Sequence, residues 1–224
     1  MVIKKNIKAN FWIRILATII DLLFFILFAI GTSFIVFNYK KANFYTENIL
    51  YRELIYRFWL LLLIIFIIFS YLLIPIFSKG QTIGMLICKI KIQANEETNK
   101  KIKISKYIFD RQRLFAFFWI FIFLSFMLIS TDGFLKAARG QKLNSAEKIV
   151  LSLPVILATI AVNLEALVIL SGIGPSRINW NDKLSKTETV WKNKYEEVEI
   201  EENKQIILPK KRELPKIHLL DKNS

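Results

Sequence analysis

Four long apolar runs restrict the folds available to this chain more than any other feature. They cover residues 11–37, 58–77, 114–130 and 149–170. A helix needs about 20 such residues to cross the roughly 30 Å of hydrocarbon in a bilayer. The runs lack the strict alternation of barrel strands, and lipid leaves a helix as the form that bonds its own backbone. The sequence therefore predicts an all-α membrane protein with four transmembrane helices.

The positive charge is sorted around these runs. The chain is 54% hydrophobic yet carries a net charge of +14. If both termini lie on the same side, 24 of the 32 Lys and Arg residues flank that side and 8 flank the other. The positive-inside rule then places both termini in the cytoplasm of a protein of the cell membrane. The charge reports topology and contact with anionic lipid headgroups, so no nucleic-acid partner is expected.

Residue types needed for several kinds of chemistry are scarce. Cys88 is the only cysteine and His218 the only histidine, which excludes a disulfide framework and argues against a metal site. The two glycines of residues 80–84 precede an interfacial segment, whereas a phosphate-binding loop follows a buried strand. We therefore expect no enzymatic activity and no cofactor.

The segments between the runs also carry patterns. Residues 80–87 predict a short interfacial helix or turn, and residues 38–57 predict a short amphipathic helix on the outer surface that runs into the second span. Cys88, Ile90 and Ile92 alternate with lysines, and Ile102 and Ile104 alternate again. This period predicts a small cytoplasmic β-hairpin. Residues 1–191 are thus expected to form the membrane domain, and residues 192–224 a charged cytoplasmic tail.

A few ionisable residues interrupt the apolar runs. Asp21 and Glu165 lie well inside them, and Arg14 lies near an edge. Charge inside a membrane is costly and normally faces protein or water. Two interpretations stay open for Asp21: a carboxylate that binds a transported ion, or a hydrogen-bond partner that fixes helix packing. Glu165 is close enough to the inner surface to extend toward headgroups.

Depth along the helices suggests which polar residues meet. Asp21, Ser70 and Asn163 are each about seven to nine residues from the cytoplasmic ends of their spans, which corresponds to about 10–14 Å. A polar layer joining three helices is expected there. Glu165, Arg14 and either Arg111 or Arg113 are expected nearer the inner surface.

Three blocks of sequence resemble the RDD family of membrane proteins, named for one arginine and two aspartates. They are residues 12–25 (WIRILATIIDLLFF), 80–92 (GQTIGMLICKIKI) and 177–190 (RINWNDKLSKTETV). The resemblance implies that Arg14, Asp21 and Asp182 are the family's charged residues. It adds Gln81 and Thr82 from the second block and Thr187 from the third. Met85 stands where the family usually has a lysine.

The resemblance also implies a function, because a transport role has been suggested for the family and some members are linked to cation/proton exchange. The sequence thus predicts transport of an ion or small solute, with Asp21 deep in the membrane and Arg14, Asp182 and Glu165 at a cytoplasmic mouth. The alternative is a non-transporting subunit or scaffold of a larger complex, in which the same residues lock the bundle. A homo-oligomer would favour the first and a complex with other proteins the second.

Overall fold

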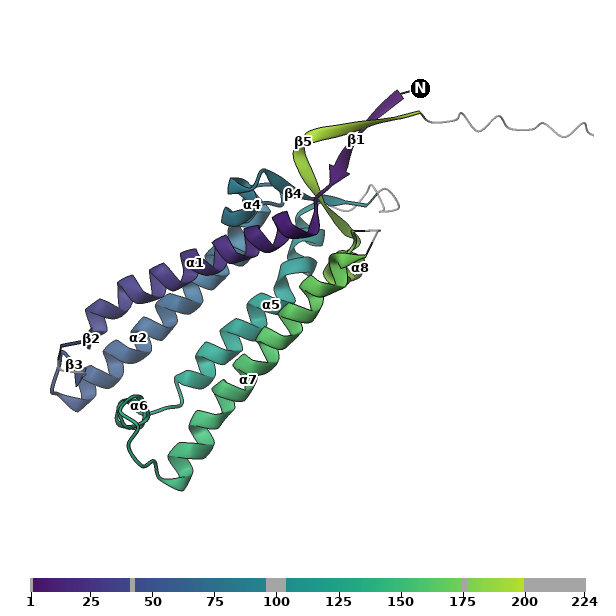
Figure 1. Ribbon diagram of the computed structural model, residues 1–224. Helices are drawn as coiled ribbons and strands as arrows, with labels where there is room; N and C mark the ends of the chain where they lie inside the picture. Colours follow the sequence, from purple (N-terminus) through teal and green to yellow (C-terminus); the bar gives the residue numbers. More distant parts are fainter. Residues whose placement is uncertain (1, 41–42, 96–103, 175–176, 200–224) are drawn as a thin grey trace, which may run out of the picture.

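Four long helices lie side by side in the computed structural model, which describes residues 2–40, 43–95, 104–174 and 177–199 (Figure 1). The first is α1 (Phe11–Val36). The second begins as α2 (Ile49–Ile67) and continues through η1 (Ile68–Leu73) and α3 (Ile74–Phe77). The third is α5 (Ile104–Phe126) and the fourth is α7 (Ser145–Leu170).

The helices have the length and surface expected of membrane spans. Within the described residues, three helical segments are long and apolar enough to cross a bilayer: Phe11–Val36, Ile49–Phe77 and Ser145–Ile173. Residues Ser105–Phe126 together with α6 (Thr131–Ala138), bent by 98°, make a fourth if the pair counts as one span. Large side chains such as Leu27 (67% exposed) and Ile35 (74%) cover the outside, where lipid would solvate them. The prediction of a mostly helical, multi-pass membrane protein is confirmed.

A wide π-helical turn interrupts the second span at η1. Its backbone has the wider spacing of a π-helix, as the Ile74 N–H donates to the carbonyl of Phe69, five residues back. Pro75 follows immediately and has no N–H to offer the carbonyl of Tyr71, four residues earlier. The wide turn accommodates this loss.

One end of the bundle, which we call the turn end, is closed by β2 (Phe37–Asn38), β3 (Asn43–Phe44) and α6. The two short strands pair antiparallel. Tyr56 is fully buried there in a cluster with Val36, Phe44, Leu60 and Leu135. The Glu53 carboxylate accepts bonds from the Thr131 N–H (2.8 Å) and hydroxyl (2.7 Å). These contacts fasten α6 to α2.

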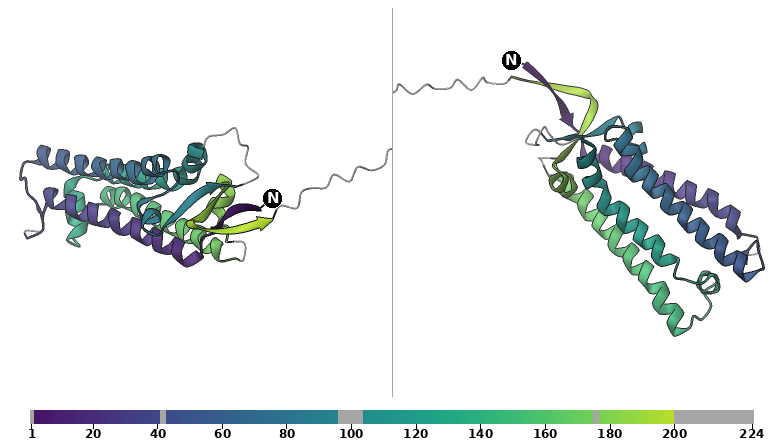
Figure 2. Two further views of the ribbon diagram at one scale, coloured as in Figure 1. Left: turned by 90° about the horizontal axis from the view of Figure 1, so that it is seen from above. Right: turned by 180° about the vertical axis from the view of Figure 1, so that it is seen from behind.

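The opposite end, the sheet end, carries a three-stranded antiparallel sheet in the order β1-β5-β4 (Figures 1 and 2). Its strands are β1 (Val2–Lys8), β4 (Ile90–Ala94) and β5 (Thr187–Glu199). Beside it lie the short helices α4 (Ile83–Ile87), η2 (Ser171–Ile173) and α8 (Trp180–Ser185). An even number of long helices brings β1 and β5 to the same end, where they pair.

The predicted hairpin needs correction. Its first strand is present as β4, but β4 pairs with β5, with Ile92 opposite Thr189. Ile104, expected in the second strand, is the first residue of α5, and Ile102 lies outside the described residues. The predicted boundary between residues 191 and 192 falls inside β5. Of the expected tail, residues 200–224 also lie outside the described part.

Candidate functional site

Asp182 lies at the sheet end between two arginines. One carboxylate oxygen accepts from Arg14 at 2.9 Å and the other accepts from Arg111. Asp182 is 1% exposed and Arg111 is 5% exposed. Charge pairs this deeply buried are stable only when the remaining donors and acceptors are also bonded. The first and last parts of the membrane domain therefore meet at this residue.

Surrounding backbone and hydroxyl groups bond further donors of the two arginines, while the buried Nε of Arg14 has no hydrogen-bond partner in the described part of the chain. Arg111 also donates to the hydroxyls of Thr187 (2.9 Å) and Thr189 (3.0 Å). Arg14 donates to the carbonyls of Arg177 (2.7 Å) and Thr189 (3.1 Å). Every one of these groups comes from α1, α5, or the segment that leads into and through α8 and β5. We call Arg14, Arg111, Asp182, Thr187 and Thr189 the arginine cluster.

Local sequence explains why Asp182 points inward. The Asn179 side chain accepts from the Asp182 N–H at 2.8 Å, and the Asp182 carboxylate accepts from the Asn179 N–H at 3.2 Å. This reciprocal pair is a capping box at the start of α8. It fixes the carboxylate at the helix N-terminus and leaves it facing both arginines.

The structure distinguishes the two arginines that the sequence left open. Arg111 is in the arginine cluster, whereas Arg113 points outward, half exposed, and pairs with Asp110 at 3.3 Å. Two positions along α5 turn a side chain by about 200°, so only one of them can face the bundle.

Asp21 lies in the middle part of α1 that faces α4, and neutral groups bind it. Its carboxylate accepts from the Thr82 hydroxyl (2.6 Å) and from the Gly84 N–H (2.7 Å). Thr82 also caps α4 by accepting from the Met85 N–H (3.3 Å). No described basic side chain forms a salt bridge with Asp21 or with Glu165.

The GQTIG segment holds α4 against α1 and the sheet. A Cβ added to Gly84 would lie 2.0 Å from the carbonyl oxygen of Ala17, so only glycine allows this approach. Gly80 has φ +93°, and a Cβ there would lie 2.7 Å from the carbonyl oxygen of Ile92. The Gln81 amide donates to the Ile90 carbonyl at 2.8 Å. The motif therefore holds in place the two groups that donate hydrogen bonds to Asp21.

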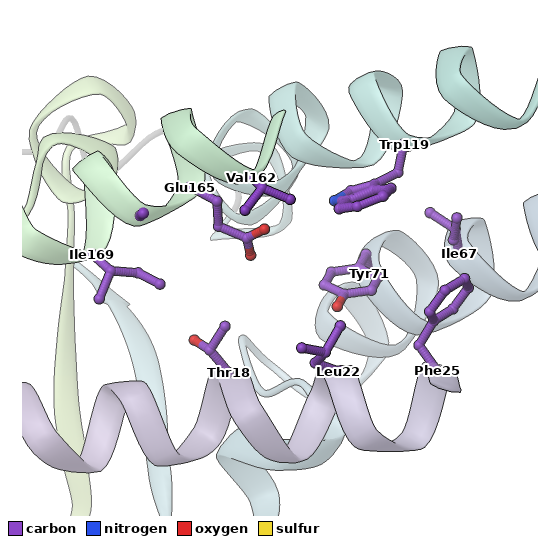
Figure 3. A pocket seen from close by; sticks show the side chains of 10 residues that line it. Thr18, Leu22, Phe25, Ile67, Tyr71, Trp119, Val162, Glu165 and Ile169 are labelled. Carbon is purple, nitrogen blue, oxygen red and sulfur yellow. The ribbon is translucent and has the colours of Figure 1, made fainter. Parts of the chain in front are cut away.

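Glu165 faces a cavity of about 250 Å³ between α1 and α7 (Figure 3). Its carboxylate projects from α7 into the space, and the indole of Trp119 lines the same cavity. Tyr71, from the wide turn, and Thr18, from α1, line the same space. The rest of the lining is apolar: Leu22, Phe25, Ile67, Val162, Ala166 and Ile169. We call this space the Glu165 cavity.

A second cavity, of about 100 Å³, links the two carboxylates with the sheet end. Asp21 and Glu165 both line it, together with Asn179 and Asn181 of the α8 region. Thr18 and Tyr71 line both this cavity and the Glu165 cavity. Arg111 is in its wall too, but the arginine is already bound to Asp182. This one cavity therefore reaches from the two asparagines at the sheet end to both carboxylates.

The predicted polar layer of Asp21, Ser70 and Asn163 does not form. The Ser70 hydroxyl donates to the Phe66 carbonyl of its own helix at 2.7 Å, and Asn163 is exposed on the outer surface of α7. Depth arithmetic places residues at one height but does not give their direction around the helix axis.

Sequence reasoning missed several residues of these sites, among them Trp119, Tyr71, Thr189, Asn179 and Asn181. The two aromatic residues stand in apolar runs among many others, so nothing separated them from lipid-facing neighbours. Thr189 had a usable signal, because Thr187, Thr189 and Trp191 alternate with period 2 and predict a strand.

Comparison with known proteins identifies the family of this chain. No curated protein and no solved structure matches it. The model of the RDD family matches residues 8–146, more than half of the chain. That interval includes Arg14, Asp21, the GQTIG segment and Arg111, and it ends before Asp182. The chain therefore belongs to the RDD family, as a multi-pass membrane protein.

Proposed function

We propose that this protein transports a cation across the membrane and that Asp21 and Glu165 bind the cation during passage. The observation that carries the proposal is the cavity that both carboxylates line, without a salt bridge from any described basic residue. A carboxylate away from bulk water attracts a cation strongly. Ionisable groups kept inside a membrane domain commonly mark ion pathways.

The position of the cavity supports the same proposal. Asn179 and Asn181 provide polar groups at the sheet end, and Asp21 and Glu165 follow deeper along α1 and α7. The distribution of Lys and Arg favours the cytoplasm for this end and for both termini. A cation entering from the cytoplasm would then meet the asparagines first. Lysines around the sheet end would contact anionic lipid headgroups.

Flux measurements in vesicles test the proposal. Purified protein is reconstituted with a pH-sensitive dye inside, and Na⁺ or K⁺ gradients are imposed at several pH values. We expect pH-dependent flux from the unchanged chain and none from Asp21→Asn. Glu47→Gln, at an exposed position of the first loop, is the matched control and should behave as the unchanged chain. Flux that survives in Asp21→Asn would contradict the proposal.

A non-transporting scaffold is the alternative, and one observation favours it. Both oxygens of the Asp21 carboxylate already accept a hydrogen bond from the GQTIG segment, which is what a residue that only fixes packing would do. In that case the protein would act through partners in the membrane. Purification from native membranes should then yield a stoichiometric complex with other proteins, and vesicles with this chain alone should show no flux.

A further inference from the structure

We infer that the Glu165 cavity binds a small, hydrophobic organic ammonium ion that enters from the bilayer. This inference rests on the proposed function, in which Glu165 binds a cation, and it names the chemical class of that cation. It is carried by three features of the cavity: one carboxylate, aromatic faces beside it, and an apolar remainder.

The carboxylate provides the charge recognition. Glu165 projects into the space between α1 and α7 (Figure 3). Among the described residues it has no salt-bridge partner, and the neutral indole of Trp119 lines the cavity with it. An occupant with a positive charge therefore completes the electrostatics of the site, whereas an anion or a neutral apolar molecule leaves the carboxylate without a counter-charge.

The aromatic residues favour an ammonium ion. Trp119 and Tyr71 lie on the side of the cavity next to Glu165, and Phe25 lies farther along α1 (Figure 3). Faces of Trp and Tyr attract alkylated ammonium groups through their negative quadrupole, and a carboxylate beside them adds to this attraction.

The remaining wall argues against a bare divalent cation. Besides Glu165, the cavity offers side-chain oxygens from Thr18 and Tyr71, and the other lining residues are aliphatic or aromatic. Ca²⁺ and Mg²⁺ require about six or more oxygen ligands. An organic cation carries its own apolar groups, which replace water against Leu22, Val162 and Ile169.

Size and access limit the occupant further. The volume of about 250 Å³ is below the range of about 300–1,000 Å³ that is typical of drug-sized ligands. Leu22 (46% exposed) and Val162 (54%) stand at its rim on the outer surface of α1 and α7. Within a membrane this rim faces hydrocarbon, so a cation that partitions into lipid reaches the cavity directly.

Calorimetric titration of the purified, detergent-solubilised protein tests the inference. The probe is phenyltrimethylammonium, whose charge does not depend on pH, and the comparison ligand is the neutral tert-butylbenzene. We expect saturable binding of the ammonium only, weakened at least about tenfold in Glu165→Gln, because the counter-charge is lost. Trp119→Leu should weaken binding about three- to tenfold, and Trp119→Phe should weaken it less.

Matched variants separate site binding from partition into the micelle. Glu47→Gln and Trp12→Leu change the same residue types at exposed positions and should leave binding unchanged. Monodisperse elution of each variant verifies that it is folded. The inference is overturned if the ammonium does not saturate, if tert-butylbenzene binds equally well, or if Glu165→Gln binds as the unchanged chain does.

The binding and flux measurements fail independently. Flux of Na⁺ or K⁺ without ammonium binding would refute the inference and leave the proposed transport standing. Saturable, Glu165-dependent binding without flux of any cation, including the radiolabelled probe, would support the inference and refute transport.

Discussion

Asp182 and Glu165 are both acidic residues away from bulk water, yet their surroundings differ in every respect. Asp182 is 1% exposed and is bound by two arginines and by the backbone of α8. Glu165 faces a cavity with a neutral indole as its neighbour. A carboxylate whose acceptor sites are filled by its own chain holds the fold together. One that lacks a counter-charge has the capacity to bind something else.

Removing the Asp182 charge should have the largest effect on stability. Asp182→Asn would leave Arg14 and Arg111 buried without their counter-charge, at a cost of about 3–5 kcal/mol. We expect a much lower yield of monodisperse protein and a thermal transition at lower temperature in detergent. Asp110→Asn, which removes the half-buried partner of the exposed Arg113, is the control and should cost at most about 1 kcal/mol. Equal stability of the two variants would contradict the assignment of a locking role to Asp182.

Gly84→Ala tests whether the close packing of α4 against α1 holds the donors of Asp21 in place. The added Cβ would meet the Ala17 carbonyl, so α4 must move away from α1 and the hydrogen bond from the Gly84 N–H must lengthen. We expect a loss of about 1–3 kcal/mol, the usual cost of overpacking, measured by thermal denaturation. Gly31→Ala is the control, since nothing lies within 4 Å of its added Cβ, and it should be neutral or slightly stabilising.

Glu165→Gln should affect function more than stability, which is the reverse of Asp182→Asn. It removes a charge that has no basic partner among the described residues. The free energy of unfolding should therefore stay within about 1 kcal/mol of that of the unchanged chain, or increase. Cation flux and ammonium binding should both fall. If this variant is destabilised as strongly as Asp182→Asn, then the contrast between the two carboxylates is wrong.

The smallest expected effect is on the reactivity of Cys88. Burial raises the pKa of this thiol, and the nearby Asp21 charge adds to the rise. Less thiolate is then present at pH 8 than for a free cysteine, so iodoacetamide should react slowly with the folded protein and rapidly after unfolding in detergent. Labelling is specific because the chain has one cysteine. Faster labelling in Gly84→Ala would report the displacement of α4.

The sequence predicted the parts of the fold that depend on local pattern. Apolar runs located the long helices, and period 2 located β4. The partner of β4 was missed because β5 lies about a hundred residues away, and no local signal links the two strands. Arg14, Asp182 and Glu165 were expected in one charged cluster at the inner end; the structure pairs the first two but places Glu165 outside that cluster, facing a cavity. The aromatic side of the Glu165 cavity was not predicted, because the rotation of a helix about its axis depends on the helices packed against it.

The distance along the chain between Arg14 and Asp182, 168 residues, sets an order of events during synthesis. At about 5–20 residues per second, Arg14 is made on the order of ten seconds or more before its partner. Arg111 also precedes Asp182, and β1 and β4 precede β5, the strand that joins them. Until then both arginines must find water or lipid phosphates. Closure of the sheet end is thus a late step of biogenesis, because it needs residues from both ends of the membrane domain.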